Sequence, residues 1–284
     1  YERLLVDLSW ASSRLEGNTY SRLDTELLLE FGQRADGKDA TEAQMILNHK
    51  AAIDLLVSLG PELRVSEQLL RGLHARLAEN LMRHKAHEGQ LRRGEVGITN
   101  SKYYPTAVPQ LITDCFARIA STAAAIPDPF EQSFFLLVHL PYLQPFNDVN
   151  KRTSRLAANI PLIAGNLCPL TFVDVPPQRY AAAILSVYEL KRTEPLREVF
   201  VQAYEQSCAL YIVAQEAVTP PNPLRLKYRD ALRTAVADVV RGGLAPSSRW
   251  SEQWAAQHGI PRSDHTAFAE LLVELLLALN DASA

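Results

Sequence analysis

The sequence predicts an all-α fold, and three observations support this. Apolar residues recur at helical spacing along most of the chain, strand-like alternation is scarce, and Gly and Pro separate the periodic segments. The chain has 284 residues, 47% of them hydrophobic, so it is long enough to bury one large core or two smaller ones. We expect a helical domain over 1–217 and a smaller helical segment over 224–284.

Helices are expected over most of the chain. The clearest is 40–59, whose apolar residues form one stripe that Gly60 and Pro61 end. The segment 129–143 is apolar on nearly all sides, which predicts a central buried helix. The full set of predicted ranges is 2–14, 22–34, 40–59, 66–80, 108–125, 129–143, 151–164, 177–190, 195–216, 224–241, 248–257 and 265–280.

Two stretches depart from the helical pattern. Residues 88–107, which we call the flap segment, are rich in Gly, contain β-branched residues and end in two tyrosines and a proline. This pattern predicts a short β-hairpin. The stretch "VTPPNP" (218–223) has three prolines in six residues and predicts a linker between the two helical parts.

Composition excludes several classes of function. The net charge of −3 indicates no broad basic field, which argues against bulk binding of nucleic acid or of anionic membranes. No apolar run approaches the ~18–20 residues of a membrane span. Three separated cysteines (Cys115, Cys168 and Cys208) form no CxxC pair, so neither a zinc site nor a disulfide framework is indicated. With no signal-peptide pattern, we expect a reducing, cytoplasmic location.

The chemistry of the chain concentrates in "QPFNDVNKRTSR", residues 144–155, which we call the signature loop. Pro145 is expected to end the preceding helix, and Asn150 to cap a helix that starts at Lys151. The free N–H groups of that helix start would attract an anion, above all a phosphate. Arg152 and Arg155 lie three residues apart on one helical face and could reach the same ligand.

A carboxylate precedes these cations. Asp148 could hold Mg²⁺, which prefers one or two carboxylates together with phosphate oxygens. The pattern therefore favours a nucleotide polyphosphate with its metal. The alternative is an ordinary capped helix start with surface ion pairs.

The signature loop resembles that of the Fic/Doc (Fido-fold) family, HPFx(D/E)GN(G/K)RxxR. The resemblance implies the helical Fido fold with ATP and Mg²⁺ as cofactors. It makes Phe146 a core anchor and Asp148 the metal ligand. Asn150 and the following backbone would form an anion hole, and Arg152 would grip nucleotide phosphates. Lys151 would also bind the nucleotide phosphates, and it gives the variant closest to Doc. The matching positions are Pro145, Phe146, Asp148, Asn150, Lys151, Arg152 and Arg155.

A second motif agrees with this resemblance. The stretch "SSRLEGN" (12–18) fits the family's inhibitory pattern (S/T)xxxE(G/N) through Ser12, Glu16 and Gly17. Ser12 and Glu16 are four residues apart, on one helical face. In the family this glutamate pairs with the second arginine of the signature, here Arg155, and occupies the space of the γ-phosphate. The alternative interpretation is a helix that ends at Gly17 with a polar last turn.

The resemblance assigns roles to two further regions. The flap segment would clamp an unknown target protein by strand addition, with Ser101, Tyr103 and Tyr104 as its binding residues. Tyr180 falls in the region that lines the adenine pocket.

One departure from the family bears on activity. Gln144 occupies the position of the catalytic His, and an amide cannot act as a base near neutral pH. Loss of a general base costs ~10²–10⁴-fold in rate, so transfer should be weak or absent. His139 is interpreted as a core histidine rather than a substitute. Gln144 is either native or an inactivating substitution. Val149, which replaces a family glycine in the same loop, favours the first.

The C-terminal segment allows a helix-turn-helix around Ala255–Gly259. Residues 264–284 contain no Lys or Arg, which argues against DNA binding and favours packing on the main domain or homodimerisation. The leading hypothesis is an ATP- and Mg²⁺-binding, AMP-transferring protein that the Glu16–Arg155 pair inhibits. The rivals are a pseudoenzyme that senses nucleotide or holds a protein partner, and a Doc-like phosphotransferase.

Overall fold

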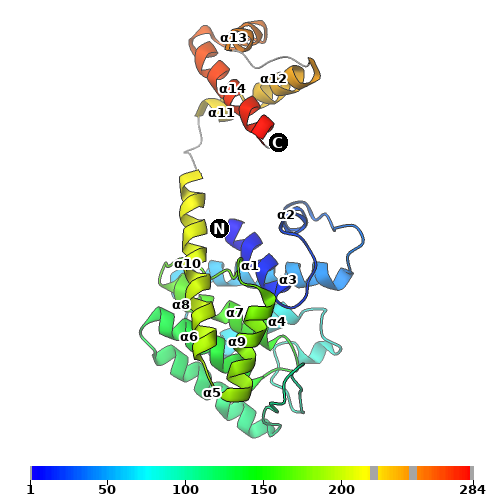
Figure 1. Cartoon of the computed structure of the whole chain (residues 1–284), viewed down its shortest axis with the longest axis vertical. Helices are drawn as coiled ribbons and strands as arrows, with labels where there is room; N and C mark the ends of the chain where they lie inside the picture. The colour runs from blue at the N-terminus through cyan, green and yellow to red at the C-terminus, as the bar shows by residue number, and fades with distance from the viewer. Residues whose placement is uncertain (1, 218–222, 243–247, 282–284) are drawn as a thin grey trace. The chain divides into compact units, whose positions relative to one another are not determined.

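A computed structural model describes residues 2–217, 223–242 and 248–281. Every regular element in these ranges is helical, which confirms the all-α fold (Figure 1). The α-helices are α1 Glu2–Arg14, α2 Arg22–Phe31, α3 Ala40–Leu59, α4 Glu67–Ala78, α5 Pro109–Ala125, α6 Pro129–Leu143, α7 Asn150–Ala157, α8 Asn159–Ala164, α9 Pro177–Leu190, α10 Glu194–Ala217, α11 Pro223–Lys227, α12 Arg229–Gly242, α13 Ser248–Gln257 and α14 His265–Asp281. Three short 3₁₀ turns cover Gly60–Glu62, Lys85–His87 and Arg262–Asp264.

The chain divides into two compact units, Tyr1–Ile212 and Val213–Ala284. The division falls inside α10, which continues to Ala217. Most of the predicted linker, residues 218–222, lies outside the described residues, and Pro223 already begins α11.

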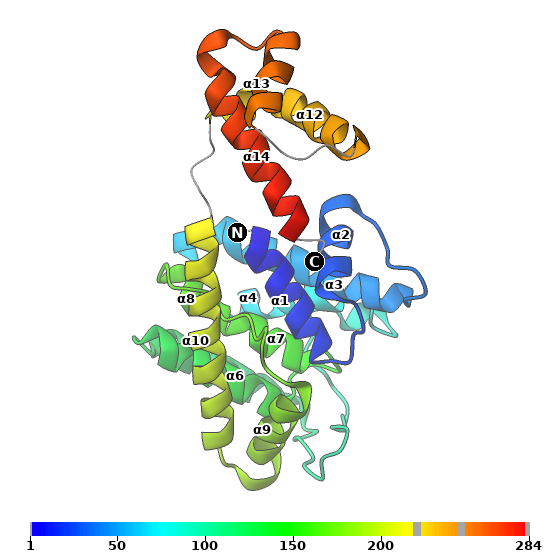
Figure 2. The same ribbon diagram turned by 45° about the horizontal axis from the view of Figure 1, so that its top comes forward.

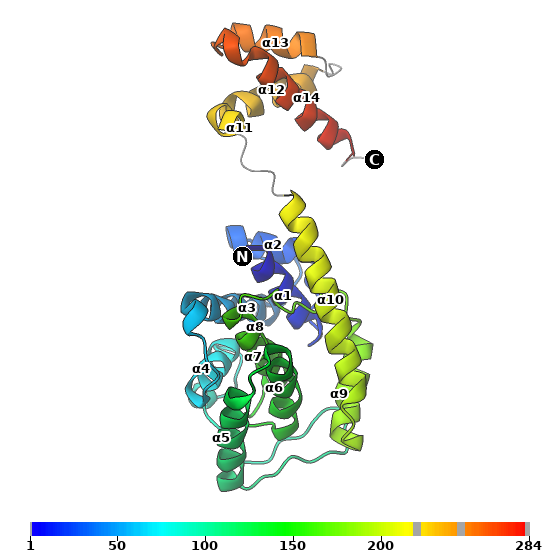
Figure 3. The same cartoon turned by 90° about the vertical axis from the view of Figure 1, so that its left-hand side faces the viewer.

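The centre of the first unit is α6. It packs against α5 and α7, and also contacts α8 and α9. Two apolar clusters meet at this helix: one joins it to α3, α4, α5 and α7, and the other to α9 and α10, which run side by side (Figure 3). Burial on all sides agrees with the apolar sequence of 129–143.

The N-terminal helix α1 lies against α2 and α3 (Figure 2). Its last residue, Arg14, donates from Nη2 to the carbonyl oxygens of Val173 and Val175, at 2.7 and 3.0 Å, and its guanidinium lies over the Trp10 ring. These contacts hold the end of α1 against the segment that leads into α9, and α1 also contacts α7.

The flap segment corrects the sequence prediction, because residues 88–107 contain no β-strand. Side chains take the backbone groups that a hairpin would pair. The buried guanidinium of Arg92 donates to the carbonyl oxygens of Gly94 and Thr106, both at 2.6 Å. Glu189 of α9 accepts hydrogen bonds from Ser101 Oγ and from Lys102 N. The segment is therefore an irregular loop anchored at both ends.

The predicted helix 151–164 is broken into α7 and α8 at Ala158. Pro161 has no N–H to donate to the carbonyl of Ala157, so the helical ladder is interrupted there. The predicted helix 224–241 is likewise divided, by Tyr228, into α11 and α12.

The second unit has its own small core. Trp254 and Phe268 stack with ring centroids 5.8 Å apart, and Tyr228 packs edge-on against Phe268. Gly259, at φ +76°, provides the turn between α13 and the residues that lead to α14. None of the helices in the described ranges has the length and apolar character needed to span a bilayer.

Candidate functional site

Two residues of the signature loop, at either end of its non-helical part 144–149, lie in the left-handed region. Gln144, at φ 50°, ends α6, and Val149, at φ 65°, precedes α7. A positive φ is rare for a β-branched residue and costs on the order of 1–3 kcal/mol. Val149 is also 3% exposed and packs in the apolar core, so its surroundings hold this conformation.

Asn150 corrects the predicted cap. It is the first residue of α7 rather than the residue before it, and its amide turns back into the loop. Its Oδ1 accepts from Phe146 N at 2.9 Å, and its Nδ2 donates to Phe146 O at 2.9 Å and to Gln144 Oε1 at 2.8 Å. Asn150 therefore closes the loop on itself.

Phe146 anchors the loop in the core, where it is fully buried. Its ring stacks on His74 of α4, with centroids 3.8 Å apart. His74 also binds the backbone on both sides: Nε2 lies 3.2 Å from Asp148 O, and Nδ1 accepts from Gly89 N at 2.9 Å. Because Nδ1 accepts, Nε2 carries the proton and donates. Burial lowers the pKa of His74 to about 4.

The two arginines of the loop are buried and incompletely paired. Arg155 is 0% exposed and Arg152 is 7% exposed. In both side chains Nη1 is buried and has no hydrogen-bond partner. Neighbouring N–H groups in the first turn of α7 also precede the helical ladder, which starts with Thr153 N donating to Val149 O. Buried guanidinium groups are normally hydrogen-bonded, so these donors form a candidate anion-binding site.

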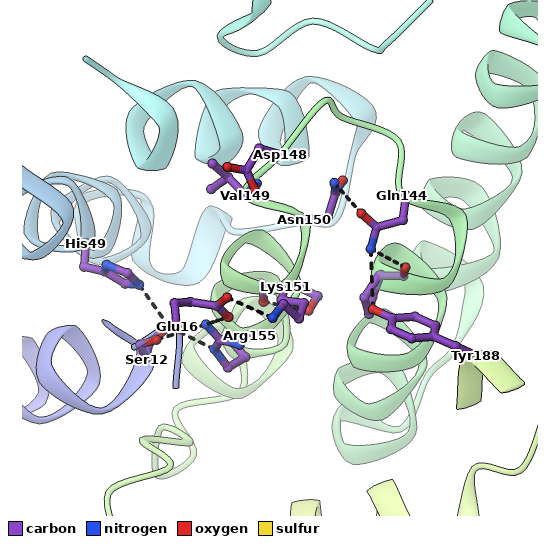
Figure 4. A network of polar contacts seen from close by, with 12 residues as sticks. Ser12, Glu16, His49, Gln144, Asp148, Val149, Asn150, Lys151, Arg155 and Tyr188 are labelled. Atoms are coloured by element: carbon purple, nitrogen blue, oxygen red, sulfur yellow. Dashed lines mark hydrogen bonds and ion pairs between the residues drawn. The ribbon is translucent and has the colours of Figure 1, made fainter. Parts of the chain in front are cut away.

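The carboxylate of Glu16 occupies part of this candidate anion-binding site (Figure 4). Its carboxylate lies 2.8 Å from Arg155 Nη2 and 2.9 Å from Lys151 Nζ. Helix α1 ends at Arg14, so Glu16 lies in the following turn, and Gly17 at φ +91° completes that turn. Burial opposes ionisation of Glu16, but Arg155 and Lys151 outweigh it and hold the pKa of the carboxyl below its ordinary value.

Ser12 binds the same arginine from the last turn of α1. Arg155 donates from Nε to Ser12 Oγ at 2.9 Å and from Nη2 to Ser12 O at 3.0 Å. His49 of α3 reaches the same hydroxyl, with Nε2 2.9 Å from Oγ (Figure 4). The predicted Ser12, Glu16 and Arg155 therefore meet, together with a histidine that sequence reasoning missed.

Asp148 lies exposed in front of these cations. Its Oδ1 accepts from Val149 N at 2.6 Å. No group of three or more His, Cys, Asp and Glu side chains in the described ranges could hold a metal by itself. A metal here would need ligand oxygens in addition to one carboxylate, which is how Mg²⁺ binds with nucleotide phosphates.

The side chain of Gln144 is fully engaged. Its Nε2 donates to Pro141 O at 2.8 Å and lies 3.4 Å from Tyr188 Oη, while its Oε1 accepts from Asn150. Burial raises the pKa of Tyr188, so this neighbour cannot serve as a base near neutral pH. His139 is exposed on α6, with its ring tilted against that of Phe135, so the prediction of a core histidine is wrong.

Tyr180, from α9, belongs to the same cluster. It is 2% exposed, and its ring lies 5.2 Å from the Arg155 guanidinium. The contact is with the arginine that binds Glu16, and Phe172 packs edge-on against Tyr180.

The predicted target-binding residues of the flap segment divide into two kinds. Ser101 is bound to Glu189, and Tyr103 stacks on Tyr142 and Tyr188, with centroids 4.7 and 5.9 Å apart. Tyr104 is 82% exposed. Two of the three therefore anchor the segment to the domain, and Tyr104 faces solvent.

Arg92 connects the flap segment to the signature loop, and sequence reasoning missed it. Its backbone N donates to Pro145 O at 2.9 Å, and its Nε donates to Gln144 O at 2.5 Å. The sequence feature that could have pointed to Arg92 is its position between glycines at the start of the flap segment. His49 and His74, which were also missed, are polar residues on the apolar faces of predicted helices.

The region around this site matches a known family. The model of the Fic/DOC family matches residues 64–162, from just before α4 into α8. This chain contains a Fic domain. Two adenylyltransferases named fic-1, from Caenorhabditis briggsae and C. elegans, are each 26% identical to it, over 211 and 209 residues. Each match covers 71% of this chain and 40% of the relative's length.

Solved structures share the fold of the Fic domain. C. elegans Fic-1 (residues 134–508) is 24% identical, with a TM-score of 0.61, over 75% of this chain and 63% of that one. A Fic family protein from Desulfovibrio desulfuricans is 20% identical, with a TM-score of 0.62, over 77% and 68%. A Fic-domain signalling protein from Bacteroides thetaiotaomicron is 16% identical, with a TM-score of 0.64, over 76% and 88%. At these identities the likeness establishes the fold.

Proposed function

We propose that this Fic domain binds ATP with Mg²⁺, and that Glu16 inhibits it by occupying the nucleotide's phosphate region. The observation that carries the proposal is the pair of buried guanidinium donors, Nη1 of Arg152 and Nη1 of Arg155, that have no acceptor. Leaving a buried charged donor unsatisfied costs about 1–3 kcal/mol or more, which an anionic ligand would recover.

The residues of the site fit a triphosphate and its metal. The first N–H groups of α7 and Arg152 would bind phosphate oxygens, and Asp148 would hold Mg²⁺ from the solvent side. Mg²⁺, when bound, neutralises phosphate charge. Arg155 is committed to Glu16 and Ser12 in the inhibited form, so a phosphate would compete with Glu16 for it.

The reaction that best fits this chain is AMP transfer to a target hydroxyl, supported by the adenylyltransferase relatives. Its rate would be low because Gln144 cannot take the hydroxyl proton. A pseudoenzyme that binds nucleotide without transfer is the second candidate, and the fully hydrogen-bonded Gln144 side chain favours it. Phosphotransfer, suggested by Lys151, is a third.

Binding of ATP with Mg²⁺, measured by calorimetry, tests the nucleotide site. Three proteins are compared: the chain itself, Glu16→Gly, and Glu16→Gly with Arg152→Ala. We expect Glu16→Gly to tighten binding about tenfold or more and Arg152→Ala to abolish it. Glu16→Gln, which removes the charge and keeps the size, should tighten binding less than Glu16→Gly, because its side chain still occupies the phosphate region. If none of the variants binds ATP, the proposal is wrong.

A further inference from the structure

The inhibitory contact extends to a residue outside both motifs. His49 of α3 is 1% exposed and contacts the hydroxyl of Ser12, which is itself 1% exposed. The same hydroxyl accepts from Arg155 Nε. The side chains of three separate helices, α1, α3 and α7, therefore meet at one oxygen atom (Figure 4).

The direction of each hydrogen bond follows from the partners. His49 Nδ1 lies 2.8 Å from the carbonyl oxygen of Met45, which can only accept, so Nδ1 carries the proton. A longer contact of 3.4 Å joins Nδ1 to Ser13 Oγ. In the neutral ring Nε2 must then accept, so Ser12 Oγ–H donates to it. The lone pairs of the Ser12 hydroxyl are left for Arg155.

This arrangement orients the guanidinium of Arg155. Its Nε and Nη2 bind Ser12, and Nη2 also binds Glu16. Without an acceptor at His49 the Ser12 hydroxyl proton would have no fixed partner, so the lone pairs that receive Arg155 would be less firmly oriented. By accepting the hydroxyl proton, His49 thus orients the lone pairs of Ser12 Oγ toward Arg155.

We propose that His49 is a positioning residue for the inhibitory contact: through Ser12 it holds Arg155 on the Glu16 side and away from a nucleotide phosphate. The proposal rests on the proposed function, because it concerns regulation of the same site. It predicts that breaking the His49–Ser12 hydrogen bond makes ATP bind more tightly. Damage to the core alone would give the opposite effect or none.

The test uses His49→Leu, which keeps bulk and removes both nitrogens, and His49→Gln, whose amide can present an acceptor near the Nε2 position. Each is made in the chain itself and in Glu16→Gly, and the affinity for ATP with Mg²⁺ is measured by calorimetry. We expect His49→Leu to tighten binding about fivefold in the chain itself and to change it less than about twofold in Glu16→Gly. His49→Gln should stay within about twofold of the unchanged protein.

Ser12→Ala breaks the same contact from the other side and serves if His49→Leu does not fold. It should tighten binding to the same degree. If Glu16→Gly tightens binding while His49→Leu and Ser12→Ala do not, the role of His49 is overturned and the inhibition by Glu16 stands. If Glu16→Gly has no effect on ATP affinity, the proposed inhibition fails, and the role of His49 fails with it.

Discussion

Asn150 donates from Nδ2 to Oε1 of Gln144, over 2.8 Å, so the residue at the position of the family base is bound to the residue expected to form the anion hole. At the other end of the Gln144 amide, Nε2 donates to the carbonyl oxygen of Pro141. Gln144 is thus hydrogen-bonded through both ends of its amide, and an amide cannot act as a base near neutral pH.

Restoring a base at this position should restore transfer. In the Glu16→Gly background we expect Gln144→His to raise the rate of AMP transfer by about 10²–10⁴-fold, because a histidine supplies the missing general base. The measurement is incorporation of label from α-labelled ATP into protein, and γ-labelled ATP distinguishes phosphotransfer. Gln144→Asn is the matched control and should remain inactive. Equal rates for the His and Asn variants would contradict this interpretation.

Removing the Arg152 side chain should lower the affinity for ATP without lowering the stability of the fold. Its Nη1 is buried without a partner, so Arg152→Ala is expected to leave the free energy of unfolding unchanged within about 1 kcal/mol, or to raise it. ATP affinity should nevertheless fall to an undetectable level. Urea unfolding and calorimetry measure the two quantities, with the exposed Arg118 changed to Ala as control. A large loss of stability would show that Arg152 supports the fold instead.

Stability should decrease in mildly acidic solution. Burial lowers the pKa of His49 to about 3 and of His74 to about 4, from an ordinary 6.5. Below pH 6.5 the unfolded chain therefore binds protons that the folded chain does not, and stability present above pH 6.5 is lost as the pH falls toward 4. Between pH 7 and pH 5 each histidine should contribute a loss of about 2 kcal/mol.

The check is urea unfolding at pH 7 and pH 5. His74→Asn should roughly halve the difference between the two pH values, whereas His84→Asn, at an exposed position, should leave it unchanged. The same difference in all three proteins would mean that other groups control the pH dependence.

Arg92 should hold the flap segment in place. Arg92→Met removes the donor shared by the carbonyls of Gly94, Thr106 and Gln144, and we expect a loss of about 2–4 kcal/mol in the free energy of unfolding. Amide hydrogen exchange should also accelerate selectively over 94–106. Arg93→Met, at the exposed neighbouring position, is the control. Unchanged exchange in the segment would argue that the contacts at Glu189 suffice.

The sequence predicted what depends on local periodicity and on recognisable residue spacing. The ranges 40–59, 129–143 and 177–190 match α3, α6 and α9 because apolar stripes and terminal Gly or Pro residues determine them locally. The meeting of Glu16 with Arg155 was also foreseen, from two motifs 139 residues apart. The flap segment does not form a hairpin because two side chains, Arg92 within the segment and Glu189 of α9, bind its backbone.

The contacts that no pattern could predict are those between elements. His49 and His74 become functional neighbours only because α3 and α4 pack against α1 and α7. The sequence around each histidine does not indicate which backbone group or hydroxyl it will bind. The second cation on Glu16, Lys151, was assigned to the nucleotide by resemblance, and its contact with Glu16 needed the turn after α1 to be known.

The left-handed conformation of Val149 has a consequence for how the signature loop can be used. A β-branched residue adopts that conformation only when its environment over-determines it, here through the apolar core around α4 and α5. The twelve residues of the loop therefore do not determine its conformation by themselves. If they were grafted between two helices of an unrelated protein, the backbone would relax, and the geometry proposed to bind phosphate would be lost.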